Sequence, residues 1–149
     1  MKINSFWIAV QKLLIFLLFW NILTLRTEKG GMTMMIQRKE YLNKLIAFKD
    51  KHLIKVVTGI RRCGKSTLLE IYQNWLLEKG IEKEQIISIN FEDIDFEELT
   101  DYRRLYSYLK ERLVPGKVTY IFLDEIQHVE EFPKVVDSLY IKKNVDIYI

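Results

Sequence analysis

The fold class is indicated most clearly by the stretch Gly59-Ile60-Arg61-Arg62-Cys63-Gly64-Lys65-Ser66. It fits the spacing G-x-x-x-x-G-K-[ST], and it separates an apolar, β-branched run at 52–58 from a segment at 65–79 with apolar residues at helical spacing. A strand, a glycine-containing loop and a helix in this order are the context in which such a loop binds phosphate groups. The stretch therefore predicts a phosphate-binding loop in an α/β fold.

The residue types of this loop suit the binding of a nucleotide. Glycine allows backbone angles and a close approach that a Cβ atom would block. The loop N–H groups then form an anion site at the positive end of the following helix. Lys65 is expected to offer its charge to the β- and γ-phosphates of ATP, Ser66 its hydroxyl to Mg²⁺, and Thr67 a donor to the α-phosphate. The predicted nucleotide-binding residues are Gly59, Ile60, Arg61, Arg62, Cys63, Gly64, Lys65, Ser66 and Thr67.

Two features of the loop have alternative interpretations. Cys63 is either a small residue at an unconstrained position or a thiol made acidic by the helix N-terminus, whose oxidation would block nucleotide binding. Arg61 and Arg62 either contact phosphate or a partner subunit, or are solvated surface charges.

An acidic pair forms the second motif. The apolar run at 120–123 ends in Asp124 and Glu125. At the carboxyl end of a parallel strand, Asp124 would face the phosphate loop and hold Mg²⁺ together with Ser66. Glu125 would be the general base that polarises the attacking water. We therefore predict Lys65 and Glu125 as catalytic residues, and Ser66 and Asp124 as metal ligands.

Other polar residues near these motifs are less clearly assigned. Asn90, Glu92 and Asp93 end the second strand, where they either line the site or belong to a solvated acidic loop. Gln127 follows the acidic pair closely enough to reach the site. The histidines, His52 and His128, are predicted to be ordinary strand-edge and loop residues, since they are not spaced as a metal pair.

Helices and strands alternate along the chain after the first helix. A three-layer α/β/α sandwich with a mainly parallel sheet is therefore predicted. The expected helices are 37–49, 65–79, 99–113 and 132–142, and the expected strands are 52–58, 86–91, 118–123 and 145–149. Because the chain ends within an apolar strand, we expect the natural protein to continue beyond it.

The composition excludes several classes of protein. With one cysteine in 149 residues, the chain cannot be a disulfide-stapled scaffold. The net charge of +3 comes from residues 1–33, which contain four basic residues and one acidic residue; residues 34–149 contain 19 of each. The globular part thus has no basic excess to support nucleic-acid binding.

Residues 1–33 form a hydrophobic segment that differs from the rest of the chain. The run from Leu13 to Leu25 is short for a membrane span and contains polar residues. Three interpretations are open: a misassigned start, with translation beginning at Met34; a membrane anchor; or a signal peptide. We expect a cytoplasmic ATPase domain at 34–149, with attachment to a membrane through Leu13–Leu25 as the alternative.

The combination of GIRRCGKS, INFED and YIFLDEIQ resembles a prokaryotic branch of AAA-type P-loop ATPases. The resemblance covers about residues 36–149 and implies an AAA sheet order, ATP hydrolysis with Mg²⁺, and a C-terminal domain following the ATPase module. The expected partners are ATP, that C-terminal domain and a protein client of unknown identity, with further copies of the chain as an open alternative.

The leading functional hypothesis is therefore an ATP-hydrolysing domain of a longer protein. The alternatives are a non-catalytic ATP-binding switch and a membrane-anchored ATPase. A small-molecule kinase is less favoured, because a second carboxylate after Asp124 suits the activation of water.

Overall fold

The computed structural model describes residues 39–60 and 63–149. The predictions for residues 1–33, including the run from Leu13 to Leu25 and a start at Met34, lie outside the described residues, as do those for Arg61 and Arg62. None of the helices within the two described ranges is long and apolar enough to cross a membrane. The elements, in chain order, are α2 (Lys39–Ala47), β1 (Ile54–Lys55), α3 (Lys65–Glu78), η1 (Lys83–Gln85), β2 (Ile86–Asn90), η2 (Ile94–Thr100), α4 (Tyr102–Glu111), β3 (Thr119–Asp124), η3 (Ile126–His128), α5 (Phe132–Tyr140) and β4 (Val145–Tyr148).

Four parallel strands form one sheet in the order β1-β4-β3-β2. β3 lies between β2 and β4, with Ile121 in register with Ile87 on one side and Ile147 on the other. Its first five residues are all buried. This burial explains the unbroken apolar run, because a parallel strand with helices on both faces has no solvent-exposed side.

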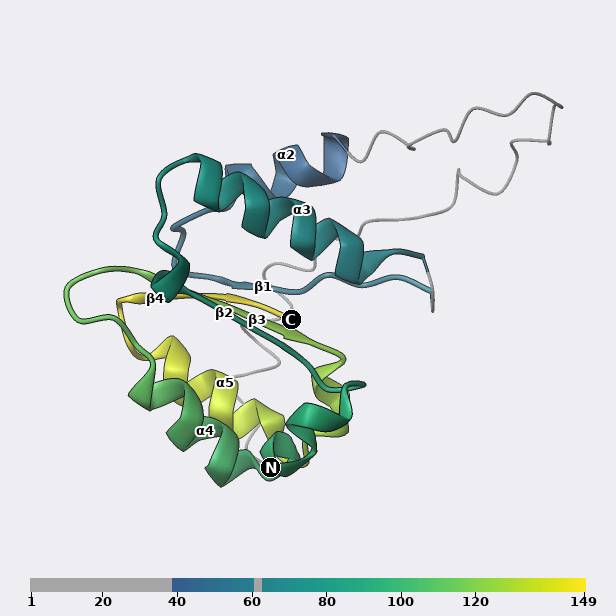
Figure 1. Cartoon of the computed structure of the whole chain (residues 1–149), viewed down its shortest axis with the longest axis vertical. Coiled ribbons are helices and arrows are strands. Elements are labelled where there is room, and N and C mark those ends of the chain that lie inside the picture. The colour runs from purple at the N-terminus through teal and green to yellow at the C-terminus, as the bar shows by residue number, and fades with distance from the viewer. Residues whose placement is uncertain (1–38, 61–62) are drawn as a thin grey trace, which may run out of the picture.

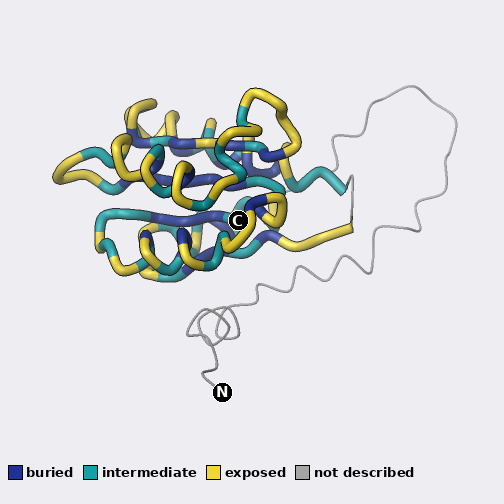
Figure 2. Tube along the Cα trace, turned by 90° about the horizontal axis from the view of Figure 1, so that it is seen from below, coloured by how far each residue is buried: buried dark blue, intermediate teal, exposed yellow. Residues whose placement is uncertain are grey.

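Helices cover both faces of the sheet, α2 and α3 on one and α4 and α5 on the other (Figure 1). Side chains alternate along β3, so that Tyr120 and Phe122 pack in the core beneath α3, while Ile121 and Leu123 pack in the core beneath α4 and α5. The buried strands lie between two layers whose outer turns are exposed (Figure 2). The three-layer α/β fold with a parallel sheet is thus confirmed.

The first strand is shorter than the predicted range of 52–58. β1 contains only Ile54 and Lys55, although hydrogen bonds to the last strand continue past it. The Val57 N–H donates to the Ile149 carbonyl at 2.7 Å, and the Ile149 N–H donates to the Lys55 carbonyl at 2.9 Å. Within the described residues β1 pairs with β4 alone, and its regular strand geometry ends at Lys55, before the phosphate loop.

The helix predicted at 99–113 is present, but it begins later than predicted. The structure has a 3₁₀ helix, η2, followed by α4, and Asp101 separates them. The Asp101 carboxylate accepts hydrogen bonds from the backbone N–H groups of Arg103 at 3.0 Å and Arg104 at 2.9 Å. An aspartate in this role is a helix N-cap, so α4 begins at Tyr102.

Candidate functional site

The phosphate loop connects β1 to α3, and its two glycines meet different physical requirements. Gly64 precedes α3 with φ 87° and ψ 34°, a left-handed conformation that disfavours a Cβ atom. A Cβ atom on Gly59 would instead lie 2.7 Å from the Cys63 Sγ. Gly64 is therefore favoured by its backbone conformation, whereas a side chain at position 59 would require Cys63 to move.

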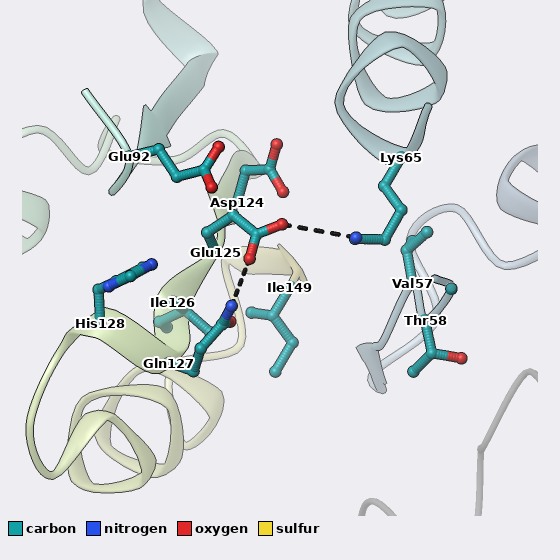
Figure 3. Close-up of a pocket in the computed structure, with 11 residues that line it drawn as sticks. Val57, Thr58, Lys65, Glu92, Asp124, Glu125, Ile126, Gln127, His128 and Ile149 are labelled. Atoms are coloured by element: carbon teal, nitrogen blue, oxygen red, sulfur yellow. Dashed lines mark hydrogen bonds and ion pairs between the residues drawn. The ribbon is translucent and has the colours of Figure 1, made fainter. Parts of the chain in front are cut away.

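A cavity of about 570 Å³ opens beside this loop, at the carboxyl edge of the sheet (Figure 3). Residues at or just after the carboxyl ends of all four strands contribute to it. Ligands bind at the carboxyl ends of parallel strands in α/β folds, so the location is typical of a ligand site. The lining residues are Val57, Thr58, Gly59, Lys65, Glu92, Asp124, Glu125, Ile126, Gln127, His128 and Ile149.

Lys65 and Glu125 form an ion pair within this cavity. The Lys65 Nζ lies 3.4 Å from the Glu125 Oε1, and both side chains are about four-fifths buried. Gln127 donates a hydrogen bond from Nε2 to the other carboxylate oxygen, Oε2 (Figure 3). This hydrogen bond holds the pKa of Glu125 below its ordinary value; burial opposes the shift, and the Lys65 charge supports it.

Glu125 is placed by a sharp change in backbone direction at the end of β3. Its φ of 54° and ψ of 37° are left-handed, which is uncommon for a residue with a side chain. The chain then turns directly into η3, where Ile126 is buried in the core beneath α4 and α5 together with Val129. The residues between these two anchors, Gln127 and His128, line the cavity.

Further carboxylates accompany Glu125 around the cavity. Asp124 is the last residue of β3, half-buried and in register with Asn90 of β2. The ligand atoms of Glu92, Glu125 and His128 all lie within 4.8 Å of one another. The cavity thus combines the ammonium group of Lys65 with a group of carboxylate oxygens, an arrangement that suits a phosphate ligand together with a cation.

Some of the predicted site residues line the cavity, and others lie outside its lining. Gly59, Lys65, Asp124 and Glu125 line the cavity, whereas the other described residues of the predicted set do not. Ser66 and Thr67 are exposed in the first turn of α3. The remaining three, Ile60, Cys63 and Gly64, belong to the loop itself.

The sequence left Glu92 and Gln127 open, and both line the cavity. His128, for which the sequence predicted an ordinary loop position, lines the cavity too. Its position in the turn directly after the acidic pair was the available signal. For His52 the structure agrees with an ordinary role, since its ring stacks on Tyr140 with centroids 4.2 Å apart.

Comparison with known proteins identifies the family. Residues 51–149 match a family model described as an AAA domain. This chain belongs to the AAA domain family. The match covers all four described strands and the acidic pair, so this AAA domain has the AAA-type P-loop fold that the sequence resemblance implied.

A relative is found in Haemophilus influenzae, where it carries the name "Uncharacterized protein". It is 40% identical over 116 residues, which cover 77% of this chain. The AAA domain chain spans only 29% of the length of that relative. No solved structure matched the chain.

Proposed function

We propose that this AAA domain binds ATP with Mg²⁺ at the carboxyl edge of its sheet and that the natural protein containing it hydrolyses the ATP. The proposal is supported by one observation: Lys65, Asp124 and Glu125 line the same cavity, which lies beside a glycine-containing loop. A cation at the start of a helix and carboxylates at the end of the neighbouring strand are the groups that phosphoryl chemistry requires.

Binding of the phosphates would depend on Lys65 and on the start of α3. The N-terminus of this 14-residue helix carries partial positive charge and offers backbone N–H donors. In the structure Lys65 pairs with Glu125. When ATP binds, the Lys65 ammonium group would pair with the phosphates instead. The remaining predicted contacts, from residues 59–67, would hold the triphosphate along the loop.

The residues available for Mg²⁺ have suitable chemistry. Asp124 offers carboxylate oxygens within the cavity, and Ser66 offers a hydroxyl one residue after Lys65. Mg²⁺ prefers oxygen ligands, so this pair fits the ion. When bound, Mg²⁺ would neutralise charge on the phosphate oxygens.

Glu125 would act as the general base. Since its pKa lies below the ordinary value, its carboxylate is ionised at neutral pH and can accept a proton from water. The attack of that water on the γ-phosphate releases inorganic phosphate and leaves ADP.

Nucleotide binding is tested by thermal unfolding of the chain with and without MgATP. At an ATP concentration near 100 times Kd, the folded state should gain about 2.7 kcal/mol. Lys65→Ala should remove most of this gain, whereas Lys110→Ala, on the exposed side of α4, should retain it. A wild-type chain whose unfolding does not respond to ATP would refute the proposal.

Hydrolysis is tested by phosphate release from the full-length natural protein that contains this chain. Glu125→Gln should retain ATP binding and lose turnover by about 100-fold or more, because the amide takes no proton from water. Asp124→Asn should weaken the dependence of turnover on Mg²⁺. Binding without phosphate release in the wild type would instead favour the non-catalytic ATP-binding switch.

A further inference from the structure

The two carboxylate oxygens of Glu125 have different partners, one in an ion pair and the other in a hydrogen bond. Oε1 faces the Lys65 Nζ at 3.4 Å, and Oε2 accepts from the Gln127 Nε2. In Figure 3 the two contacts leave the carboxylate in different directions, one toward α3 and the other toward η3. One partner is thus a cation on the phosphate-binding helix, and the other is a neutral amide on the turn that carries Glu125 itself.

The turn that carries Gln127 is held firmly against the core. Ile126 is 6% exposed and Val129 is 2% exposed, and both pack in the core beneath α4 and α5. Hydrogen bonds close the turn, from the His128 N–H to the Glu125 carbonyl at 3.2 Å and from the Val129 N–H to the Ile126 carbonyl at 2.9 Å. Because Gln127 and Glu125 belong to one short anchored segment, their contact does not depend on the position of α3.

From this geometry we infer that Gln127 is a positioning residue, which holds Glu125 Oε2 so that Oε1 stays directed toward the phosphate-binding end of the cavity. The inference rests on the ATP hydrolysis proposed above. Gln127 itself does not contact the reacting atoms in this role; it acts through Glu125.

The charges around Glu125 explain why such a partner is needed. Lys65, from α3, is the cation that pairs with Glu125. The phosphates of ATP would attract the Lys65 ammonium group away from Glu125. Glu125 would then lie among the carboxylates of Glu92, beyond β2, and Asp124, of β3, with His128 on the same turn. Repulsion from these carboxylates and from the phosphates would turn Glu125 out of the cavity. The hydrogen bond from Gln127 opposes that rotation, so Oε1 is freed from Lys65 but keeps its direction.

The first test is a separation of turnover from binding in the full-length natural protein. Gln127→Leu removes the donor, and Gln127→Glu removes it with almost no change in shape. Both variants should reduce kcat by about 10- to 100-fold, because the base is misplaced. For Gln127→Leu, which adds no charge to the cavity, the Kd for a non-hydrolysable ATP analogue should stay unchanged, since Lys65 and the loop are intact. Because Gln127 is exposed, both variants should unfold at the wild-type temperature.

Gln73→Leu is the matched control. Gln73 also loses an amide hydrogen bond, to Ser88 Oγ at 3.1 Å, but it lies on α3 and does not line the cavity. Its kcat should equal that of the wild type. If Gln127→Leu and Gln127→Glu also hydrolyse ATP at the wild-type rate, the positioning role is refuted.

A second test needs no turnover. In the NMR spectrum of the chain, the side-chain amide signal of Gln127 should shift when Glu125→Ala removes the acceptor, and should stay in place in Lys65→Ala. In the wild-type chain, the dependence of the Gln127 signal on Glu125 should also remain after addition of Mg²⁺ and the non-hydrolysable analogue. A Gln127 signal that ignores Glu125→Ala refutes the inference. A wild-type protein without phosphate release refutes the proposed hydrolysis first, and the role of Gln127 with it.

Discussion

Gly59 lies against the side chain of Cys63, and this contact gives the cysteine a packing role within the phosphate loop. The two interpretations of Cys63 were a residue without a special role and a reactive thiol. The contact shows a third property, since a Cβ atom at position 59 would lie 2.7 Å from the sulfur and would require the Cys63 side chain or the loop to move. The loop conformation therefore depends on the combined size of these two side chains.

A substitution at Gly59 should be reversible by a second one. Gly59→Ala places Cβ 2.7 Å from the Cys63 Sγ, so the Cys63 side chain or the loop must shift. If the loop bears an overpacking cost of about 1–3 kcal/mol in its ATP-binding conformation, the ATP affinity should fall by about 5- to 150-fold. Gly59→Ala combined with Cys63→Ala should restore the affinity, as measured by calorimetry with MgATP.

Gly64→Ala provides the contrast. Its cost of about 1–2 kcal/mol arises from the left-handed backbone at φ 87°, so Cys63→Ala should not restore binding. Equal rescue of both glycine variants by Cys63→Ala would contradict the assignment of separate causes.

At the scale of elements, β1 and β4 are joined by a buried ion pair as well as by their hydrogen-bond ladder. Lys55 is fully buried and Asp146 is 2% exposed, and the Lys55 Nζ contacts the Asp146 Oδ1 directly. Lys55 also donates to the Lys51 carbonyl at 2.6 Å. The other oxygen of Asp146 accepts from the Asp50 N–H at 2.9 Å and from the Tyr148 hydroxyl at 3.0 Å. A lysine inside the sheet is therefore compensated by a network of partners.

Removing one member of this ion pair should lower the free energy of unfolding strongly. Replacing both members should lower it much less. Lys55→Met leaves the Asp146 carboxylate buried without its cation, with an expected loss of about 3–5 kcal/mol in the free energy of unfolding. Lys55→Met with Asp146→Asn removes both charges, while the amide oxygen can still accept from Asp50 and Tyr148. The double variant should recover most of the loss in urea unfolding. Equal destabilisation in the single and double variants would contradict this explanation.

At the scale of the whole molecule, a hydrogen bond connects the turn after α2 with the central strand of the sheet. Asp50 lies in this turn with a left-handed φ of 58°, and its carboxylate accepts from the Tyr120 hydroxyl of β3 at 2.6 Å. Lys49 pairs with the same carboxylate. Burial raises the pKa of Tyr120 to about 12, so its hydroxyl remains a donor at neutral pH. One charged residue thus connects α2 with the central strand.

The stability of the fold should depend on the ionisation of Asp50. Burial raises the pKa of Asp50, but hydrogen bonds from Lys49 and Tyr120 outweigh it, so the folded-state pKa lies below the ordinary value of 3.8. The ionised form therefore stabilises the fold above that ordinary pKa, and this contribution is lost as the pH falls through the folded-state pKa. Because the group is partly exposed, we expect a contribution of about 1 kcal/mol or less.

Comparison of the wild type with Asp50→Asn in urea unfolding at several pH values measures this contribution. The difference in stability should be present near neutral pH and should disappear in acid, below pH 3.8. Asp95→Asn, at an exposed position in η2, serves as the control and should show no such trend. A difference between wild type and Asp50→Asn that is constant with pH would contradict the role of ionised Asp50.

The sequence by itself determined the parallel α/β architecture and the two motifs of the site. The reason is that these features are local: Gly59, Gly64 and Lys65 lie within seven residues, and Asp124 and Glu125 follow one apolar run. The order of strand, loop and helix then places both motifs at the carboxyl edge of the sheet, because consecutive parallel strands point the same way. The match to the AAA domain family agrees with that part of the prediction.

Only the tertiary structure decided which side chains meet across separate elements. Glu92 and His128 lie 36 positions apart in the sequence, yet their ligand atoms lie within 4.8 Å of each other. The partner of Lys55 is 91 residues away, and no periodicity encodes the pairing of a buried lysine with Asp146. The contact between Gln127 and Glu125 is local in sequence, but it depends on the left-handed turn at Glu125, which is followed by the buried Ile126 and Val129. Local sequence patterns specify which face of a helix or strand is apolar. Polar contacts between separate elements depend on how those elements pack, which local patterns do not specify.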